Sequence, residues 1–582
     1  MASGIRTGYN ARRMEISADD TSTARLLPLP WLAAAAGAYA LLTVALTWPL
    51  FRHPATTVLD TFSLYGGASI LIQRDINLTM WVLAWDTHAL TTHPWHVFHA
   101  NALYPAPYTL ACSEHMLGNA PLFAPVYLLT HNPVLAHQTT LLLTFVLCGL
   151  AMAAYIFYWT QDRTTAFVAG ALFAFAPFRV CQMGNLHVVS VQYLPLVLLA
   201  IDWLLDGRST RAWWVLAAGL AASSLCSYYI GYATFILAGV YLVVGVLARG
   251  AVAWPRAWRV VGGIALAAAV VAAITIPYVL LQLSGVLPKY NERGYIGLAF
   301  LGALRGPLAQ LSYYVLPRRD GVPGFLGYTV LALALLAVLR WRRMPHGGLV
   351  ALGVTGMTLG LGPYMFIPGV HTRIPMPYLV LVHLVPGFST MRVPQRFGAL
   401  ATLTAVCLAG LALAELRRSL LPRARLAAAL LPATVLALAL AEVRPRDLKG
   451  YPMNTGASVP PVYHWLAEHG DGGPLLELPA QPGNLYVESV AMYYSTYHWL
   501  PLANGYTPYP PWTYVEFTNN ARHLPTPEAL DPTLAVAPLR WLLLHRNPKM
   551  SPAEVATWYS TLTRRARLVG EFGDDTLYEV VP

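Results

Sequence analysis

The chain has 582 residues, of which 56% are hydrophobic and only 11% are charged, and its mean hydropathy is +0.49. This composition excludes an ordinary soluble enzyme. The net charge of +11 does not indicate a nucleic-acid partner, because the basic residues cluster in short loops between apolar runs, where charge sets the orientation of membrane helices. The sequence therefore predicts a polytopic α-helical membrane protein.

Eleven apolar segments are expected to span the membrane. A cytoplasmic N-terminal segment, residues 1–29, precedes them, and together they form a transmembrane domain of residues 30–442. The predicted spans are 30–51, 133–159, 164–183, 187–205, 212–229, 230–248, 259–283, 325–341, 347–368, 396–416 and 424–442.

Arginine-rich short loops predict the orientation of these spans. With eleven spans, five basic loops fall on the same side as the basic N-terminus: QDRTT, DGRSTRAW, ARGAVAWPRAWR, RWRRMPH and ELRRSLLPRAR. The positive-inside rule then places the N-terminus inside and the C-terminus outside the cytoplasmic (inner) membrane of a bacterium. The opposite face receives three outer loops, 52–132, 284–324 and 369–395, and the tail.

The tail, residues 443–582, has mixed polarity and is predicted to form a small extracytoplasmic α/β domain. GPLLELP and RWLLLH are typical of strands. SPAEVATWYSTLTRRA predicts a helix in which Ser551 is the N-cap and Glu554 completes a capping box. ARLVGEFGDDTLYEVVP predicts a hairpin that turns near Gly573.

The first outer loop carries acids among tryptophans. In RDINLTMWVLAWDTHAL, apolar residues recur at helical spacing, which favours a helix in the membrane interface that begins near Asp75 and also contains Asp86. Asp75 is either the N-cap of this helix or a functional acid. A second interfacial helix is expected over residues 114–130, where Glu114 and His115 supply an acid and an imidazole.

Further polar groups gather at the outer ends of the predicted spans. The candidate substrate-binding residues beyond His115 are Asn185, His187, Tyr228, Tyr229 and Tyr232. The candidate donor-phosphate contacts are Arg179, Arg392, Arg396, Arg318 and Arg319. Arginine forks suit phosphate. Headgroup anchoring by the arginines and an aromatic belt of tyrosines are the competing interpretations.

These residue types suit the transfer of a sugar from a polyprenyl phosphate. The acceptor hydroxyl needs a base, and Asp75, Glu114 and Asp86 are the candidate catalytic acids. The departing phosphate needs arginines or a divalent cation, Mg²⁺ or Mn²⁺, and the sequence leaves that choice open. A single displacement would invert the anomeric centre. Neither a P-loop nor a GxGxxG motif indicates a soluble nucleotide site.

Four stretches carry a family resemblance: DINLTMWVLAWDTHAL, NALYPAPYTLACSEHMLG, MRVPQRF and ANGYTPYP. They and the overall layout resemble the GT-C superfamily of integral-membrane glycosyltransferases, which includes protein O-mannosyltransferases and the aminoarabinose transferases of lipid A, and more narrowly the bacterial YfhO-type membrane proteins. The resemblance implies a catalytic acid in the first outer loop, at Asp75 or alternatively Asp60, and often a soluble C-terminal domain.

The sequence thus favours a membrane glycosyltransferase that acts on the outer face, with Asp75 as the general base. Its expected partners are a polyprenyl-phosphate sugar donor, a glycan, lipid or protein acceptor, and membrane lipids, without nucleic acid. The alternatives are a transporter or flippase of lipid-linked glycans and a non-catalytic cell-envelope assembly protein.

Overall fold

A computed structural model describes residues 27–60, 69–286, 312, 314–316, 324–340, 347–366, 373–391, 393–444, 448–481, 484–547 and 550–581. The contacts divide the chain into two compact units. Unit 1 comprises Met1–Phe51, Thr140–Ala273 and Tyr290–Leu448, and unit 2 comprises Arg52–Thr139, Ile274–Lys289 and Lys449–Pro582. This grouping joins the first long loop to the C-terminal segment, and the boundaries at 29 and 442 stay predictions about the membrane.

Unit 1 is built almost wholly from helices. They are α2 (Leu29–Leu46), α3 (Trp48–Phe51), the larger part of α7 (Pro133–Thr160), α8 (Arg163–Ala174), α9 (Pro177–Val180), α10 (Leu186–Val189), α11 (Tyr193–Leu205), α12 (Ala212–Cys226), α13 (Tyr228–Arg249), α14 (Trp254–Ile274), α18 (Tyr328–Leu339), α19 (Gly347–Gly360), α20 (Pro377–Leu384), α21 (Gly398–Leu420) and α22 (Arg425–Val443). Short 3-10 turns η4 (Gly250–Val252), η6 (Phe388–Thr390) and η7 (Pro394–Phe397) and a hairpin of β2 (Tyr364–Phe366) with β3 (Arg373–Pro375) complete it.

The protein is a multi-pass membrane protein. Among the described residues, seven helical segments are long and apolar enough to cross a membrane, and each coincides with a predicted span. The other four predicted spans coincide with shorter helices: α8 with α9, α12, α18 and α19. The span predicted at 164–183 is broken because Pro177 follows Ala176, whose backbone is extended (φ −57°, ψ 143°), as expected for the residue before proline.

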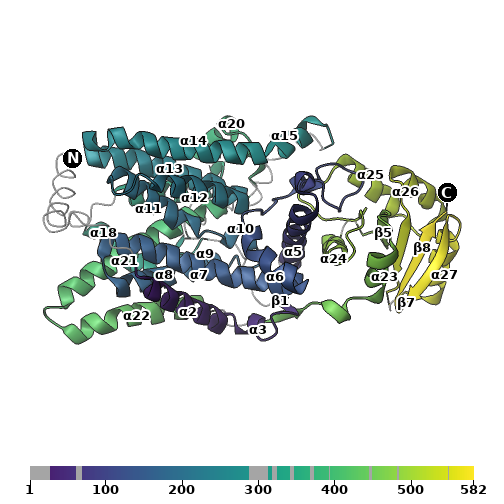
Figure 1. Cartoon of the computed structure of the whole chain (residues 1–582), viewed down its shortest axis with the longest axis horizontal. Coiled ribbons are helices and arrows are strands. Elements are labelled where there is room, and N and C mark those ends of the chain that lie inside the picture. The colour runs from purple at the N-terminus through teal and green to yellow at the C-terminus, as the bar shows by residue number, and fades with distance from the viewer. Residues whose placement is uncertain are drawn as a thin grey trace. The chain divides into compact units, whose positions relative to one another are not determined.

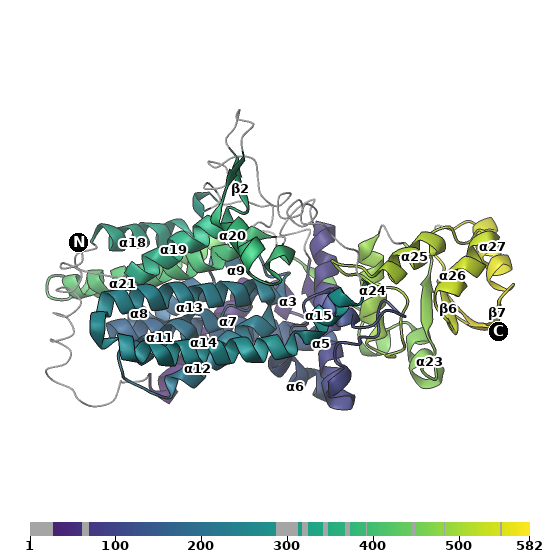
Figure 2. The same ribbon diagram turned by 90° about the horizontal axis from the view of Figure 1, so that it is seen from above.

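Helix α21 forms the core of unit 1. Its span is wholly buried by protein, and α8, α18, α19 and α22 pack around it (Figures 1 and 2). Small residues allow this close approach: a Cβ added at Gly356 would lie 2.6 Å from Leu400 Cβ. Such contacts hold membrane helices together, because lipid tails are as apolar as the side chains.

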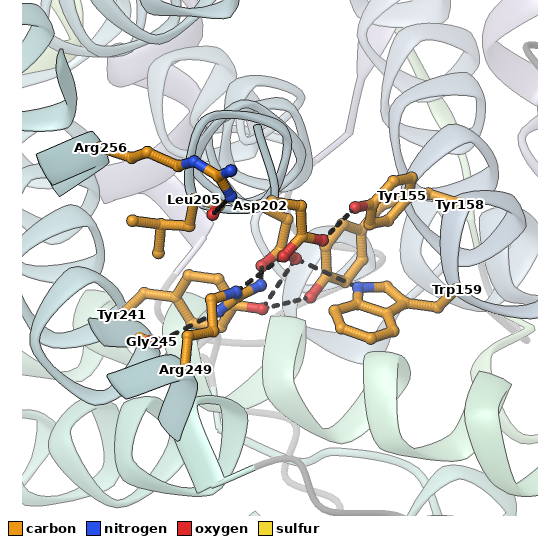
Figure 3. Close-up of polar contacts among 10 residues, drawn as sticks. Tyr155, Tyr158, Trp159, Asp202, Leu205, Tyr241, Gly245, Arg249 and Arg256 are labelled. Atoms are coloured by element: carbon orange, nitrogen blue, oxygen red, sulfur yellow. Dashed lines mark hydrogen bonds and ion pairs between the residues drawn. The ribbon is translucent and has the colours of Figure 1, made fainter. Parts of the chain in front are cut away.

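A buried polar network joins α7, α11 and α13 (Figure 3). Asp202, which is fully buried, accepts hydrogen bonds from Arg249 Nη2 (2.7 Å), Tyr241 OH (2.9 Å) and Trp159 Nε1 (3.2 Å). Arg249 Nε also donates to Asp206 (2.8 Å). Because each charge has partners, we assign the network to stability rather than to substrate binding.

We predict that Arg249→Ala lowers the free energy of unfolding by about 3–5 kcal/mol, because it leaves the Asp202 carboxylate buried without its counter-charge. Arg259→Ala, which removes an exposed arginine of α14, is the matched control and should change stability by less than about 0.5 kcal/mol. Chemical unfolding of the full chain in detergent measures both values, and equal stabilities would contradict this assignment.

Unit 2 contains the remaining elements. They are β1 (Thr57–Leu59), α5 (Ser69–Thr92), η2 (Pro94–His96), η3 (Thr109–Cys112), α6 (Ala120–Thr130), the first turns of α7, α15 (Ile276–Leu283), β4 (Gly450–Pro452), η8 (Gly456–Ser458), α23 (Pro461–His469), β5 (Leu475–Leu478), α24 (Leu485–Ser495), α25 (Trp512–Ala521), η9 (Pro527–Ala529), α26 (Leu530–Val536), β6 (Trp541–His545), α27 (Pro552–Leu562), β7 (Ala566–Phe572) and β8 (Asp575–Val580).

The C-terminal sheet confirms the predicted α/β fold of the tail. Its strand order is β5-β6-β8-β7, with β5 parallel to β6 and the other two pairings antiparallel (Figure 1). The capping box forms as predicted, since Glu554 N–H donates to Ser551 Oγ and Ser551 N–H donates to Glu554 Oε2. The β7–β8 hairpin turns at Gly573, whose φ of 71° favours glycine.

One histidine ties three strands of this sheet together. His545, on β6, contacts Asp575 Oδ1 on β8 through Nδ1 (2.7 Å) and Glu477 Oε2 on β5 through Nε2 (3.0 Å). Burial works against the charged imidazole, but hydrogen bonds to the two carboxylates outweigh burial and raise the pKa of His545 to about 10. The protonated imidazole therefore stabilises the folded sheet at neutral pH.

We predict that this stabilisation is complete below the unfolded pKa of about 6.5 and is lost as the pH rises toward the folded pKa of about 10. The difference in free energy of unfolding between wild type and His545→Gln should therefore shrink across that window. Chemical denaturation at stepped pH measures this difference, and His464→Gln, at an exposed position on α23, is the control. A difference that stays constant from pH 6.5 to 10 would contradict the prediction.

Candidate functional site

Helix α5 carries Asp75 in its second turn. The helix begins at Ser69, so Asp75 does not cap it, and the N-cap interpretation is wrong. Leu78, Trp81 and Val82, which were expected to face the membrane interface, are buried by protein. Helix α24 packs against α5 (Figures 1 and 2). Asp75 is partly accessible, with 28% of its side chain exposed.

A tail segment pairs with the loop that follows α5. Leu502 N–H donates to Asn101 O (2.6 Å) and Tyr104 N–H donates to Leu502 O (2.9 Å). On its other side the same segment continues the C-terminal sheet, because Ala503 N–H donates to Leu475 O (2.8 Å). The loop after α5 and the tail, some 400 residues apart, thus share one hydrogen-bonded arrangement.

Buried side chains fix the turn after this segment, ANGYTPYP. Asn504 bonds both backbone groups of Glu477, accepting from its N–H (2.7 Å) and donating to its carbonyl (3.0 Å). Gly505 N–H donates to the buried carboxylate of Glu488 (3.1 Å). Gly505 lies so close to Leu103 that an added Cβ would come within 2.6 Å of that side chain. The position therefore requires glycine.

The turn places the Tyr506 side chain beside Asp75. The Tyr506 hydroxyl donates to Asp75 Oδ1 (2.9 Å), and Arg74 lies over the Tyr506 ring at 4.7 Å while its Nε is 3.8 Å from Asp75 Oδ1. The next residue, Thr507, donates to Cys112 O (2.5 Å). A partly exposed carboxylate is thus oriented by a phenol and flanked by a cation, which suits a general base that keeps its position during proton transfer.

Asp86 lies in the same helix but in a different environment. Its side chain is fully buried, and both carboxylate oxygens are without a hydrogen-bond partner in the described part of the chain. Burial raises the pKa of Asp86 well above its usual range. A fully buried carboxyl offers no accessible oxygen to an acceptor hydroxyl, so we leave Asp86 out of the proposed mechanism.

Glu114 and His115 follow η3, as expected beside the second helix. Glu114 is partly accessible. His115 is buried, contacts the Phe98 and Tyr278 rings, and accepts at Nδ1 from Leu117 N–H (3.1 Å). Burial lowers the pKa of His115 to about 3, so its imidazole is neutral at physiological pH. The predicted helix at 114–130 forms over residues 120–130 as α6.

Unit 1 brings two of the predicted residues together. The Arg396 guanidinium lies 4.4 Å from the Tyr229 ring centre. His187 lies on α10 and is partly accessible. Arg396 Nε has no hydrogen-bond partner within the described residues. Tyr229 OH also accepts from Val393 N–H (3.2 Å). Arg396 thus lies beside the Tyr229 ring with one N–H that no described residue accepts.

The other predicted residues of unit 1 occupy structural positions. Arg179 is fully buried and donates to Val189 O, Ala174 O and Thr144 Oγ1, so we leave it out of the proposed phosphate contacts. Tyr232 donates to Pro386 O (2.5 Å). Tyr228 begins α13, and Asn185, which precedes α10, is buried.

Three predicted arginines, Arg318, Arg319 and Arg392, lie outside the described residues. The described parts of the chain hold no group of three or more His, Cys, Asp or Glu side chains arranged for a metal ion. We route no reaction step through a divalent cation.

Comparisons with known proteins bear on this architecture. A family profile described as bacterial membrane protein YfhO matches residues 122–291, and no curated protein matches the chain. Among solved structures, the arabinofuranosyltransferase AftD from Mycobacteria aligns over 96% of this chain and 40% of its own, with 16% identity and a TM-score of 0.61. At this identity the likeness shows the fold alone: the chain shares the fold of part of AftD. It spans two fifths of the length of AftD.

Two further solved structures align more loosely. They are the oligosaccharyltransferase AglB from Archaeoglobus fulgidus, with 11% identity over 88% of this chain and 69% of that one (TM-score 0.46), and ArnT from Cupriavidus metallidurans, with 14% identity over 87% and 98% (TM-score 0.39). Only the AftD alignment exceeds a TM-score of 0.5, so only that likeness bears on the fold.

Sequence reasoning missed the residues that orient Asp75. Tyr506 and Asn504 were not candidates, although ANGYTPYP, with its Asn-Gly pair and prolines, had the composition of a rigid turn. Arg74 was likewise overlooked beside Asp75. The signal was present in the motif, but nothing in the sequence indicated which distant helix this turn would contact.

We predict that Gly505→Ala destabilises the protein by about 1–3 kcal/mol, because the added methyl group would overlap Leu103. Tyr506→Phe should cost only about 1 kcal/mol, since it removes one hydrogen bond and keeps the ring. Thermal unfolding of the full chain measures both. Gly262→Ala, where a Cβ meets open space on a helix, is the control. Equal effects at 505 and 262 would contradict the close packing of the turn.

Proposed function

We propose that this protein transfers a sugar from a polyprenyl-phosphate donor to an acceptor hydroxyl on the outer face of the cytoplasmic membrane, with Asp75 as the general base. The observation that carries the proposal is the environment of Asp75: a partly exposed carboxylate held at 2.9 Å by Tyr506 and adjoining Arg74. The GT-C fold supports lipid-linked sugar transfer, and the distribution of basic loops supports the orientation.

In the proposed reaction, Asp75 accepts the proton of the acceptor hydroxyl as its oxygen attacks the anomeric carbon. The bond from that carbon to the phosphate oxygen breaks, and the polyprenyl phosphate leaves with the electron pair. One displacement inverts the anomeric centre. Tyr506 holds the carboxylate in place, so that its basic oxygen does not have to be reoriented during the reaction.

A cation is also needed for the phosphate that departs. We propose Arg74 for this role, because within the same unit its Nε lies 3.8 Å from Asp75 Oδ1. Arg396 of unit 1, whose Nε–H is unsatisfied among the described residues, is a separate candidate for binding a phosphate. Arginine binds phosphate through paired N–H groups. Glu114, which is partly accessible, remains an alternative base, and the acceptor is a glycan, lipid or protein hydroxyl.

We predict that Asp75→Asn lowers turnover of a polyprenyl-phosphate sugar by at least about 100-fold, the usual contribution of a positioned base, with folding intact. The assay uses the full chain in proteoliposomes, a panel of polyprenyl-phosphate pentoses and hexoses, and mass spectrometry of the products. Asp471→Asn, at an exposed turn of unit 2, is the matched control and should turn over at the wild-type rate.

Two results would refute this assignment. Wild-type turnover by Asp75→Asn would exclude Asp75 as the base, and a parallel Glu114→Gln variant would then test the alternative acid. Movement of the lipid-linked sugar across the bilayer without any new glycoside would instead favour a transporter or flippase.

A further inference from the structure

A cavity of about 640 Å³ opens within unit 2, apart from Asp75. It lies at the carboxyl ends of the parallel strands β5 and β6, where α/β sheets commonly bind ligands. Helix α24 contributes Tyr486, Val490 and Tyr494 to its wall, and the sheet contributes Glu477, His545 and Asp575. This volume is in the range of small-molecule sites.

The charges around the cavity sum to an acidic surface. Three acids line the cavity, Glu477, Glu554 and Asp575, together with the bases His545 and Arg546. These five side chains carry one net negative charge when the imidazole is protonated. Electrostatics therefore disfavour a phosphate or a uronate in this cavity.

One acceptor in the cavity wall is unused. Oε2 of Glu477 accepts from Tyr463 OH (3.2 Å) and contacts His545 Nε2 (3.0 Å), whereas Oε1 has no hydrogen-bond partner in the described parts of the chain. The side chain is only 7% exposed. A buried carboxylate oxygen without a donor is costly, and a hydroxyl group from a ligand would satisfy it.

Aromatic rings form a fixed apolar wall beside these acids. Tyr494 stacks on Tyr463 with ring centres 4.6 Å apart, and its hydroxyl accepts from Asn454 Nδ2 (3.1 Å). The Tyr486 hydroxyl bonds the Tyr451 hydroxyl (2.7 Å). Rings held by hydrogen bonds offer contact area with little loss of side-chain entropy on binding.

We propose that this cavity is a binding site for a neutral oligosaccharide, whose hydroxyl groups donate to the carboxylates of Glu477 and Asp575 and whose C–H faces lie against Tyr486 and Tyr494. Hydroxyl donors, apolar ring faces and the absence of anionic charge are the ligand properties that this wall complements. Binding of a neutral oligosaccharide here does not depend on the transferase reaction. The further step, that this oligosaccharide is the acceptor, rests on the proposed function.

The test measures binding directly, without a lipid donor. The full chain in detergent is titrated by calorimetry with neutral malto-, xylo-, galacto- and arabino-tetraose, with tetragalacturonate as the anionic probe and chitosan tetramer as the cationic one. We expect at least one neutral tetraose to bind and the galacturonate to bind at least about tenfold more weakly. Glu477→Gln should weaken neutral binding by at least about tenfold, because it removes a charged acceptor.

A second variant tests the site without changing Glu477, His545 or Asp575, whose substitution could destabilise the sheet. Val490→Trp fills the cavity from α24 without touching Glu477 and should abolish binding, whereas Glu468→Gln, on an exposed part of α23, should leave it unchanged. Loss of binding by Val490→Trp at an unchanged melting temperature supports the site.

Failure of every neutral tetraose to bind, unchanged binding by Val490→Trp, or tighter binding of the chitosan tetramer than of any neutral sugar would overturn the proposal. Turnover by wild type and Asp75→Asn is scored in a separate assay, so failure of this site and failure of the transferase reaction give different results.

Discussion

The backbone pairing between residues 101–104 and 502–504 is the constraint on which the candidate site depends. It anchors the turn that carries Tyr506. Hydrogen bonds from Asn504 to β5 and from Gly505 to Glu488 then hold that turn in a single position. Backbone hydrogen bonds do not depend on side-chain identity, so the pairing itself tolerates substitutions in these segments. A larger residue at Gly505 would instead press against Leu103. Asp75 is oriented because two distant segments share one set of hydrogen bonds.

Charged groups in this chain fall into two kinds, and hydrogen bonding separates them. In the first kind, the charge is buried and hydrogen-bonded, as in Arg179, Asp202 and Arg249. Such hydrogen bonds offset the cost of holding an ion in an apolar interior. Arg396 and Glu477 each retain a polar atom that the described residues leave unsatisfied. Asp86 shows that an unsatisfied buried atom alone does not indicate a ligand site; Arg396 and Glu477 carry proposals because Arg396 also lies against Tyr229 and Glu477 also lines a cavity.

The two proposals differ in electrostatic sign. The Arg396–Tyr229 cluster of unit 1 presents a cation and suits a phosphate, whereas the cavity of unit 2 presents a net negative charge and suits hydroxyl groups. In the proposed reaction, the protein has to distinguish an anionic lipid phosphate from a neutral glycan. Opposite charges in the two clusters would favour the phosphate in one and the glycan in the other.

The sequence by itself determined the helices, the α/β fold of the tail and the helix that carries Asp75. Apolar runs of spanning length, prolines such as Pro177 and the capping box at Ser551 act locally, and local signals can be read from neighbouring residues. Only the tertiary structure decided that Asp75 lies inside α5, that Asp86 and Arg179 are buried, and that Tyr506, Glu477 and His545 gain their partners. These outcomes depend on contacts between residues up to about 430 positions apart, and no periodicity or spacing along the chain specifies which distant segments will pack together.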